Sequence, residues 1–192
     1  MAKNLAWLQE WEDFYEDVFG MMDADFSQLV IPAEVPVGKW PIVVAQGLSY
    51  NQALKACRDN FLTYSYYDDL DVAMDHAKEE RDPKSKPYVV YVGSHWEATD
   101  GDHELKELNA DIIGQRGIQT LTLRERMILE LSLYRGFKKH LDIRDVSLCS
   151  SSRYSGGFVP EASWYGGKFD VDWCSPRDVD PPSLARMPSG RT

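Results

Sequence analysis

A hairpin pattern near the C-terminus constrains the fold more than any other feature of the sequence. Residues 161–165 and 168–173 each alternate polar with apolar side chains, and the pair Gly166-Gly167 separates them. Glycine reaches positive φ without a steric cost, so this pair favours a two-residue β-turn. Such a turn fixes the register of the two strands. The predicted pairs are Tyr165 with Lys168, Trp164 with Phe169, Ser163 with Asp170, Ala162 with Val171 and Glu161 with Asp172.

This register divides the hairpin side chains between two faces. The apolar face contains Ala162, Trp164, Phe169, Val171 and Trp173. The polar face contains Glu161, Ser163, Tyr165, Lys168, Asp170 and Asp172. Only the first face is apolar enough to meet a core, so we expect Trp164, Phe169 and Trp173 to be mostly buried. We expect the polar side chains to be exposed, together with Tyr154 on a neighbouring loop.

The composition of the C-terminal block, residues 146–186, indicates a binding surface. The block is dense in Tyr, Ser, Gly and Asp, and these residue types make up adaptable recognition surfaces in which Tyr gives large contact area at low entropic cost. An ordinary small β region has the same composition, and that is the alternative reading. The candidate binding residues are Tyr154, Glu161, Ser163, Tyr165, Asp170, Asp172 and Arg177.

Length and charge narrow the class of protein. A chain of 192 residues fits one domain with an N-terminal appendage. We expect a helix and linker over residues 1–30 and a single α+β domain over residues 31–192. The net charge of −10 argues against nucleic acid as partner, because phosphate binding needs clustered Lys and Arg. No apolar stretch predicts a membrane span, and no basic, cleavable leader is apparent. A cytoplasmic location is therefore expected, with export by another route left open.

Periodicity and capping signals place the remaining elements. Residues 4–22 have the spacing of an amphipathic helix with an aromatic stripe, which we expect to pack on the domain's own core or, alternatively, on a partner. Capping boxes predict helices that begin at Ser49 and at Thr122, and a shorter helix is expected over 68–78. Strands are expected near 42–45, 62–66 and 87–92. The prediction is an N-terminal helix, a small α/β half and an antiparallel β-rich C-terminal half.

Two groups of residues are candidates for a metal site and for a disulfide bond. Six potential ligands lie between His95 and Glu104, but their spacing matches neither an EF-hand nor HExxH, which favours a solvated loop. The sequence therefore predicts no metal and no cofactor. Cys57, Cys149 and Cys174 form no CxxC pattern, so we expect free thiols, with a Cys149–Cys174 disulfide as the alternative.

Enzymatic readings remain as alternatives. His140, Asp142 and Cys149 are parts that a hydrolase uses, and Glu161 opposite Asp172 is a carboxylate pair. No GxSxG elbow or other recognisable nucleophile context accompanies them. The leading hypothesis is a non-enzymatic protein that binds a protein or other ligand. The rivals are a hydrolase-type enzyme and an acidic regulator that occupies a basic partner.

Two segments resemble a family of uncharacterised bacterial proteins. One is residues 104–144, and the other begins with Leu148-Cys149 and contains the pattern LCxxSR, a glycine turn, VP, W, a short turn, VxW and LxR. The resemblance covers roughly the last ninety residues and implies no established function.

The same tail resembles, more loosely, the variable regions of proteins diversified by retroelements. Those regions lie on a C-type-lectin-like fold and bind ligands, and their mutagenesis yields Tyr, Ser, Asp and Gly around a fixed skeleton. Here such residues flank Phe158, Trp164, Phe169, Val171, Trp173 and Leu184. The closing Leu184-Ala-Arg186 departs from the usual Gly-Phe-Arg ending. The resemblance implies a C-type-lectin-like fold and a ligand-binding role for the tail.

Overall fold

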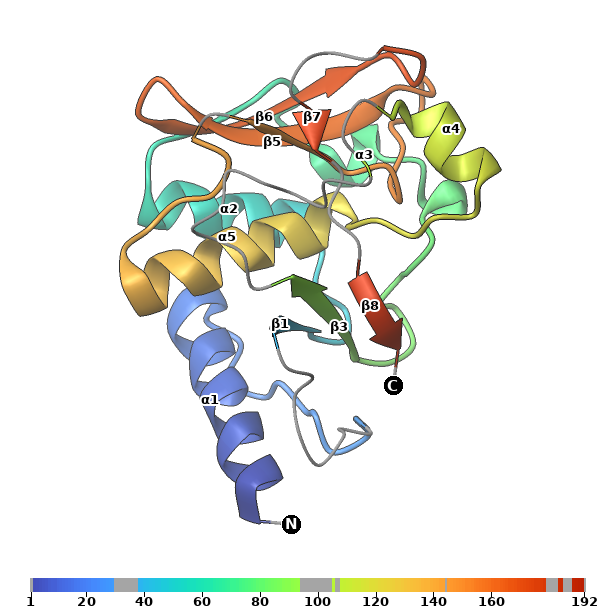
Figure 1. The fold of residues 1–192 in the computed structure, drawn as a ribbon. Coiled ribbons are helices and arrows are strands. Elements are labelled where there is room, and N and C mark those ends of the chain that lie inside the picture. The colour runs from blue at the N-terminus through green and yellow to red at the C-terminus, as the bar shows by residue number, and fades with distance from the viewer. Residues whose placement is uncertain are drawn as a thin grey trace.

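The computed structural model describes residues 2–29, 38–93, 105, 108–143, 145–178, 183–184 and 188–191. Helices α2 and α5 lie between a five-stranded sheet and a three-stranded sheet, and α1 packs beside them (Figure 1). The helices are α1 (Ala2–Phe19), α2 (Tyr50–Asn60), α3 (Leu70–Ala73), α4 (Ala110–Gln115) and α5 (Leu123–Phe137), with a 3-10 turn at His76–Lys78. The strands are β1 (Lys39–Val44), β2 (Thr63–Ser65), β3 (Tyr88–Gly93), β4 (Val146–Leu148), β5 (Val159–Tyr165), β6 (Lys168–Cys174), β7 (Ser183–Leu184) and β8 (Pro188–Arg191). The fold is therefore α+β.

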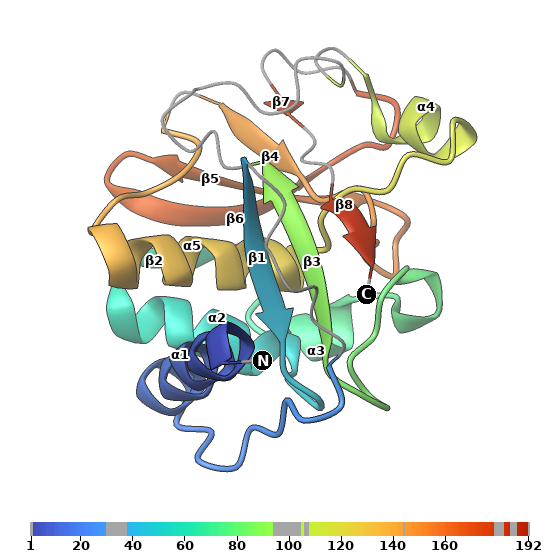
Figure 2. The same cartoon turned by 60° about the horizontal axis from the view of Figure 1, so that its bottom comes forward.

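The capping box at Thr122 begins the central helix α5 as predicted. The Thr122 hydroxyl accepts from the backbone N–H of Glu125, and the Glu125 carboxylate accepts from that of Thr122. Lys138 ends the helix in the left-handed region, at φ 53°. Buried side chains lie around almost the whole circumference of α5, because one side faces the five-stranded sheet and the other faces β1 (Figure 2). The prediction that this helix belongs to the core is confirmed.

Helix α1 packs its aromatic stripe on the core of the domain. Trp11, Phe14 and Tyr15 are buried in the same cluster as β1 and α2. The Tyr15 hydroxyl donates to the carbonyl of Val43 (2.7 Å) and accepts from the N–H of Ala45 (3.0 Å). These bonds fix α1 against β1 and confirm the first of the two readings of the stripe. The helix ends at Phe19, earlier than the predicted residue 22.

The segment after β2 differs from the predicted helix over 68–78. Asp69 caps the short α3, and the chain then leaves the helix so that Met74 bridges Tyr154. The N–H of Asp75 donates to the carbonyl of Arg153 (2.8 Å), and the Asp75 side chain caps the 3-10 turn. The long helix does not form because the N–H of Asp75 bonds to the loop before β5 instead of to the preceding turn. The Asp75 side chain also bonds to the backbone of the next turn.

The hairpin register is confirmed at every predicted pair. β5 and β6 pair antiparallel with Tyr165 opposite Lys168 and Glu161 opposite Asp172. Gly166 and Gly167 both have positive φ, 61° and 80°, as a type I′ turn requires. The strand order in this sheet is β2-β6-β5-β4-β7, with β2 parallel to β6 and β7 parallel to β4.

The two predicted halves interleave. The strand near residues 62–66 exists as β2, but it joins the hairpin sheet and not the sheet of β1 and β3. In return β8, from the C-terminal end, pairs with β3. The grouping of 62–66 with the α/β half is therefore wrong, because pairing over long sequence distances leaves no local signal. In the described part of the chain no helix is long and apolar enough to cross a membrane.

Candidate functional site

The polar side of the hairpin forms a part-exposed surface on the face of the sheet turned away from α2 and α5. We call it the polar hairpin face, and it consists of Tyr64, Glu161, Ser163, Tyr165, Lys168, Asp170 and Asp172. Tyr165 is 72% exposed and Tyr64 43%. The other polar side chains of the hairpin are only partly exposed, so the prediction that they are exposed holds fully for Tyr165 alone. The other side of the hairpin meets the core as predicted: Phe169 is buried, and the half-buried Trp164 and Trp173 pack against the core.

Tyr64 was missed by the sequence analysis. It lies on β2 opposite Asp170 because β2 pairs parallel with β6. The two segments are about a hundred residues apart in the sequence, so no spacing rule brings them together.

One cation of the chain is already held on this surface. The Lys168 ammonium lies 3.2 Å from an Asp170 carboxylate oxygen and 4.2 Å from the centre of the Tyr64 ring. A carboxylate and an aromatic face therefore contact the same charged group. Both attract cations, the first by charge and the second by its quadrupole.

A second, small core covers one end of the same sheet face. Leu148, Val159 and Cys174 project from that face and are buried against Ala110 and Ile113 of α4. The open part of the surface thus begins at Glu161 and Asp172. The sequence analysis did not anticipate α4 or this cluster, whose members are spread from residue 105 to residue 174.

Tyr154 does not belong to the exposed surface. It is 1% exposed, its ring packs on Tyr67 with centroids 4.7 Å apart, and its backbone bridges Met74. The prediction that Tyr154 is exposed is wrong, because the 153–155 loop folds back onto α3. Arg177 is exposed but lies beside α4, with its Nε 3.6 Å from Asp111.

The parts of the alternative hydrolase site are buried or paired with residues of α5. Cys149 is fully buried, and burial raises the pKa of its thiol well above the ordinary range, which disfavours the nucleophilic thiolate. His140 Nδ1 lies 2.8 Å from Glu130. Asp142 accepts two hydrogen bonds from Arg126. All three cysteines are buried and free, so the alternative Cys149–Cys174 disulfide is not formed.

A separate cluster lies between the 3-10 turn and the N-terminus of α5. Glu79 is buried there, and one of its carboxylate oxygens accepts from Arg124 (3.0 Å) and from the Tyr50 hydroxyl. The Tyr50 oxygen also lies 3.1 Å from the hydroxyl of Ser152. Burial raises the pKa of Glu79 above its usual value, and burial also raises that of Tyr50, which keeps the phenol protonated as a donor.

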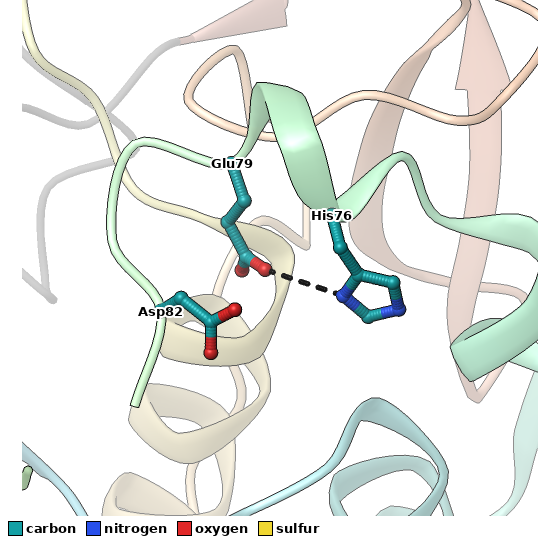
Figure 3. Close-up of side chains that lie close together, drawn as sticks. All are labelled: His76, Glu79 and Asp82. Atoms are coloured by element: carbon teal, nitrogen blue, oxygen red, sulfur yellow. Dashed lines mark ion pairs between the residues drawn. The ribbon is translucent and has the colours of Figure 1, made fainter. Parts of the chain in front are cut away.

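The other oxygen of Glu79 faces His76, and Asp82 lies close to both side chains (Figure 3). Ligand-type atoms of these three side chains lie within 4.8 Å of one another. No sequence pattern groups these three residues. The metal candidate predicted from the sequence, His95–Glu104, shares no residue with this cluster and lies outside the described residues. A pocket of about 230 Å³ adjoins the cluster. Its lining residues are Gly47, Leu48, Ser49, Asp71, His76, Asp82, Pro83, Lys84 and Arg124.

Comparison with known proteins gives no family for this chain. No family model matches the sequence, and no curated protein or solved structure is significantly similar to it.

Proposed function

We propose that this protein is a non-enzymatic binding protein whose polar hairpin face docks a cationic segment of a protein partner. The observation that supports this most directly is the position of Lys168 between Asp170 and the Tyr64 ring. On this surface one ammonium group already contacts both a carboxylate and an aromatic ring. A Lys or Arg side chain of a partner would find the same chemistry along the rest of the face.

The charge of the face is consistent with a cationic partner. Three carboxylates, Glu161, Asp170 and Asp172, share it with a single ammonium, Lys168. Glu161 and Asp172 are directly opposite each other, and like charges in that position repel. The net charge of −10 adds a long-range attraction for basic partners.

The architecture favours recognition by side chains. β5 and β6 are interior strands of the sheet, flanked by β4 and β2 over part of their length, so side chains make up most of what this face offers to a partner. The side chains stand on a rigid sheet with Phe169 and Val171 buried beneath it. Such a surface loses little conformational entropy on binding, and exposed Tyr165 and Tyr64 are of the residue type that dominates binding energy.

The sequence resemblance points to the same region. Variable proteins of retroelement origin bind ligands with a C-type-lectin-like tail, and the residues that resemble their variable positions here include Ser163, Tyr165 and Asp170. We infer a ligand-binding tail of that kind. The acidic-regulator hypothesis agrees with the present proposal in the charge of the partner. The hydrolase hypothesis draws no support from a buried thiol such as Cys149.

Peptide binding tests the proposal. Fluorescence anisotropy would be measured with labelled peptides of equal length, one series rich in Lys and Arg and one rich in Asp and Glu. We expect binding of the cationic series only, weakening as salt is raised. Tyr165→Ala and Asp170→Asn should each weaken it, the tyrosine by about 2 kcal/mol or more if it is a hot spot.

A matched control separates the face from the overall charge of the protein. Asp59→Asn removes one exposed carboxylate on α2, outside the polar hairpin face, and should bind the peptides as the wild type does. Equal losses in Asp59→Asn and Asp170→Asn would show unspecific attraction and contradict the proposal. So would equal binding of the two peptide series.

A further inference from the structure

The buried carboxylate of Glu79 is only half satisfied. The side chain is 1% exposed, and one oxygen, Oε1, accepts from Arg124 and Tyr50. The other oxygen, Oε2, makes no hydrogen bond within the described structure. A buried acceptor without a partner is costly, and more so when it is charged. Oε2 therefore points to a group that binds there.

His76 presents a second acceptor to the same space. Its Nε2 lies 2.9 Å from the carbonyl of Asp71, and a carbonyl only accepts, so Nε2 carries the hydrogen. In the neutral ring this leaves Nδ1 as a lone pair. Nδ1 is buried, has no hydrogen-bond partner among the described residues, and lies 3.9 Å from Glu79 Oε2. Two lone pairs that face each other repel unless a proton or a metal cation lies between them.

We propose that His76 Nδ1, Glu79 Oε2 and a carboxylate oxygen of Asp82 hold a divalent metal cation (Figure 3). One imidazole nitrogen with two carboxylate oxygens is a donor set that suits Mn²⁺, Fe²⁺ or Zn²⁺ better than Ca²⁺ or Mg²⁺, which prefer oxygen alone. The Asp71 carbonyl orients the imidazole, as outer partners of metal-bound histidines do. Arg124 holds Oε1 in the same way, so that Oε2 is directed at His76.

The distances allow a shared ion. Metal bonds to nitrogen and oxygen ligands of this class are about 2.0–2.2 Å long, so two ligands of one ion lie at most about 4.4 Å apart. The 3.9 Å between Nδ1 and Oε2 is within this reach. Asp82 follows the 3-10 turn with its side chain 27% exposed, and a small inward movement brings it to the ion. The adjoining pocket of about 230 Å³ leaves room for water ligands.

Neighbouring cations set the strength of the site. Arg124 contacts Glu79 (3.0 Å) and Lys84 contacts Asp82 (3.2 Å), so the two carboxylates are partly neutralised before a metal arrives. We therefore expect reversible binding of Mn²⁺, weaker than in a structural zinc site with thiolate ligands. The chelated protein should stay folded, because the cluster lies beside the core and the main hydrophobic cluster does not include it.

Binding of Mn²⁺ alone, followed by calorimetry and NMR, tests the site. Chelator-treated protein should bind one Mn²⁺, and the ring signals of His76 should broaden first among the four histidines. Asp82→Asn and Glu79→Gln should weaken binding at least tenfold, as loss of a metal contact generally does. Asp75→Asn is the matched control: it removes a nearby carboxylate that contacts Lys78 instead of the cluster, and it should bind Mn²⁺ as the wild type does.

Three outcomes would overturn the inference. The first is no binding of Mn²⁺ or Zn²⁺. The second is broadening of His95 or His103 without His76, which would place the metal on the segment His95–Glu104. The third is unchanged affinity in Asp82→Asn, a variant at a part-exposed position that keeps its fold even where Glu79→Gln does not. None of these results bears on the polar hairpin face, so the two proposals fail independently.

Discussion

The indole of Trp164 stacks on the imidazole of His140, with ring centroids 3.3 Å apart and planes inclined by 11°. His140 in turn contacts Glu130 through Nδ1 (2.8 Å), and Glu130 accepts from Arg126 (2.7 Å). The stack therefore joins the hairpin to a buried ion network on α5. This explains why Trp164 faces inward although the core covers it only in part.

The two sides of the hairpin should respond differently to truncation. Phe169→Ala removes a fully buried ring and is expected to lower the free energy of unfolding by about 3–5 kcal/mol. Tyr165→Ala removes a ring that is mostly in solvent and should stay within about 0.5 kcal/mol of the wild type. Urea denaturation measures both. A larger loss for Tyr165→Ala than for Phe169→Ala would mean that the faces are reversed.

Helix α5 should tolerate core truncation poorly. Leu131 is buried in the main hydrophobic cluster, and Leu131→Ala is expected to cost about 2–5 kcal/mol through lost contacts and the cavity left behind. Val72→Ala on the exposed side of α3 is the control. Val72 is 76% exposed, so this substitution should be nearly neutral. Thermal unfolding of Leu131→Ala that matches the wild type would show that α5 is peripheral.

The sequence was sufficient where the deciding interaction was local. Two capping boxes placed the starts of α2 and α5, and Gly166-Gly167 determined the register of the hairpin. Each depends on residues no more than a few positions apart. The same local logic identified six side chains of the polar hairpin face, Glu161, Ser163, Tyr165, Lys168, Asp170 and Asp172.

Long-range pairing was not recoverable in this way. Tyr64 joins the face only because β2 pairs parallel with β6, and Tyr154 leaves it because its loop bridges Met74. The cluster of His76, Glu79 and Asp82 lies within seven residues of sequence, but its spacing matches no metal motif. The cluster becomes a candidate metal site only because Glu79 is buried against Arg124 and Tyr50, which are distant in the chain.

The buried pair of Arg81 and Glu125 should be sensitive to loss of one charge. Arg81 donates to both oxygens of Glu125, at 2.6 and 2.7 Å, and both side chains are buried. Glu125→Gln keeps the shape but leaves the buried guanidinium with only the more distant, part-exposed Glu80 (3.4 Å) as counter-charge, which is expected to cost about 3–5 kcal/mol. Asp59→Asn breaks the exposed pair with Lys55 and should change stability by about 0.5 kcal/mol or less. Similar losses for the two variants in urea denaturation would contradict this contrast.

The ionisation of Glu79 should make the stability of the protein depend on pH. Burial raises the pKa of this carboxyl in the folded protein above the ordinary value of 4.5 that it has in the unfolded chain. Between these two pKa values the folded state holds a proton that the unfolded state has released. The contribution of Glu79 to the free energy of unfolding therefore falls as the pH rises through that window.

Glu79→Gln replaces the titrating carboxyl group by an amide and so isolates the effect of its ionisation on stability. Free energies of unfolding would be measured in chelator from about pH 4 to pH 7, a range that brackets the ordinary carboxyl pKa, for the wild type and the variant. Other carboxyl groups titrate in both proteins and cancel in the difference. The stability of the wild type relative to the variant should decline as the pH rises, because only the wild type must ionise a buried acid. Added Mn²⁺ should weaken that decline, since a bound cation favours the ionised carboxylate. A difference that is flat or rises with pH in chelator would show that the carboxyl of Glu79 is not destabilised by its burial.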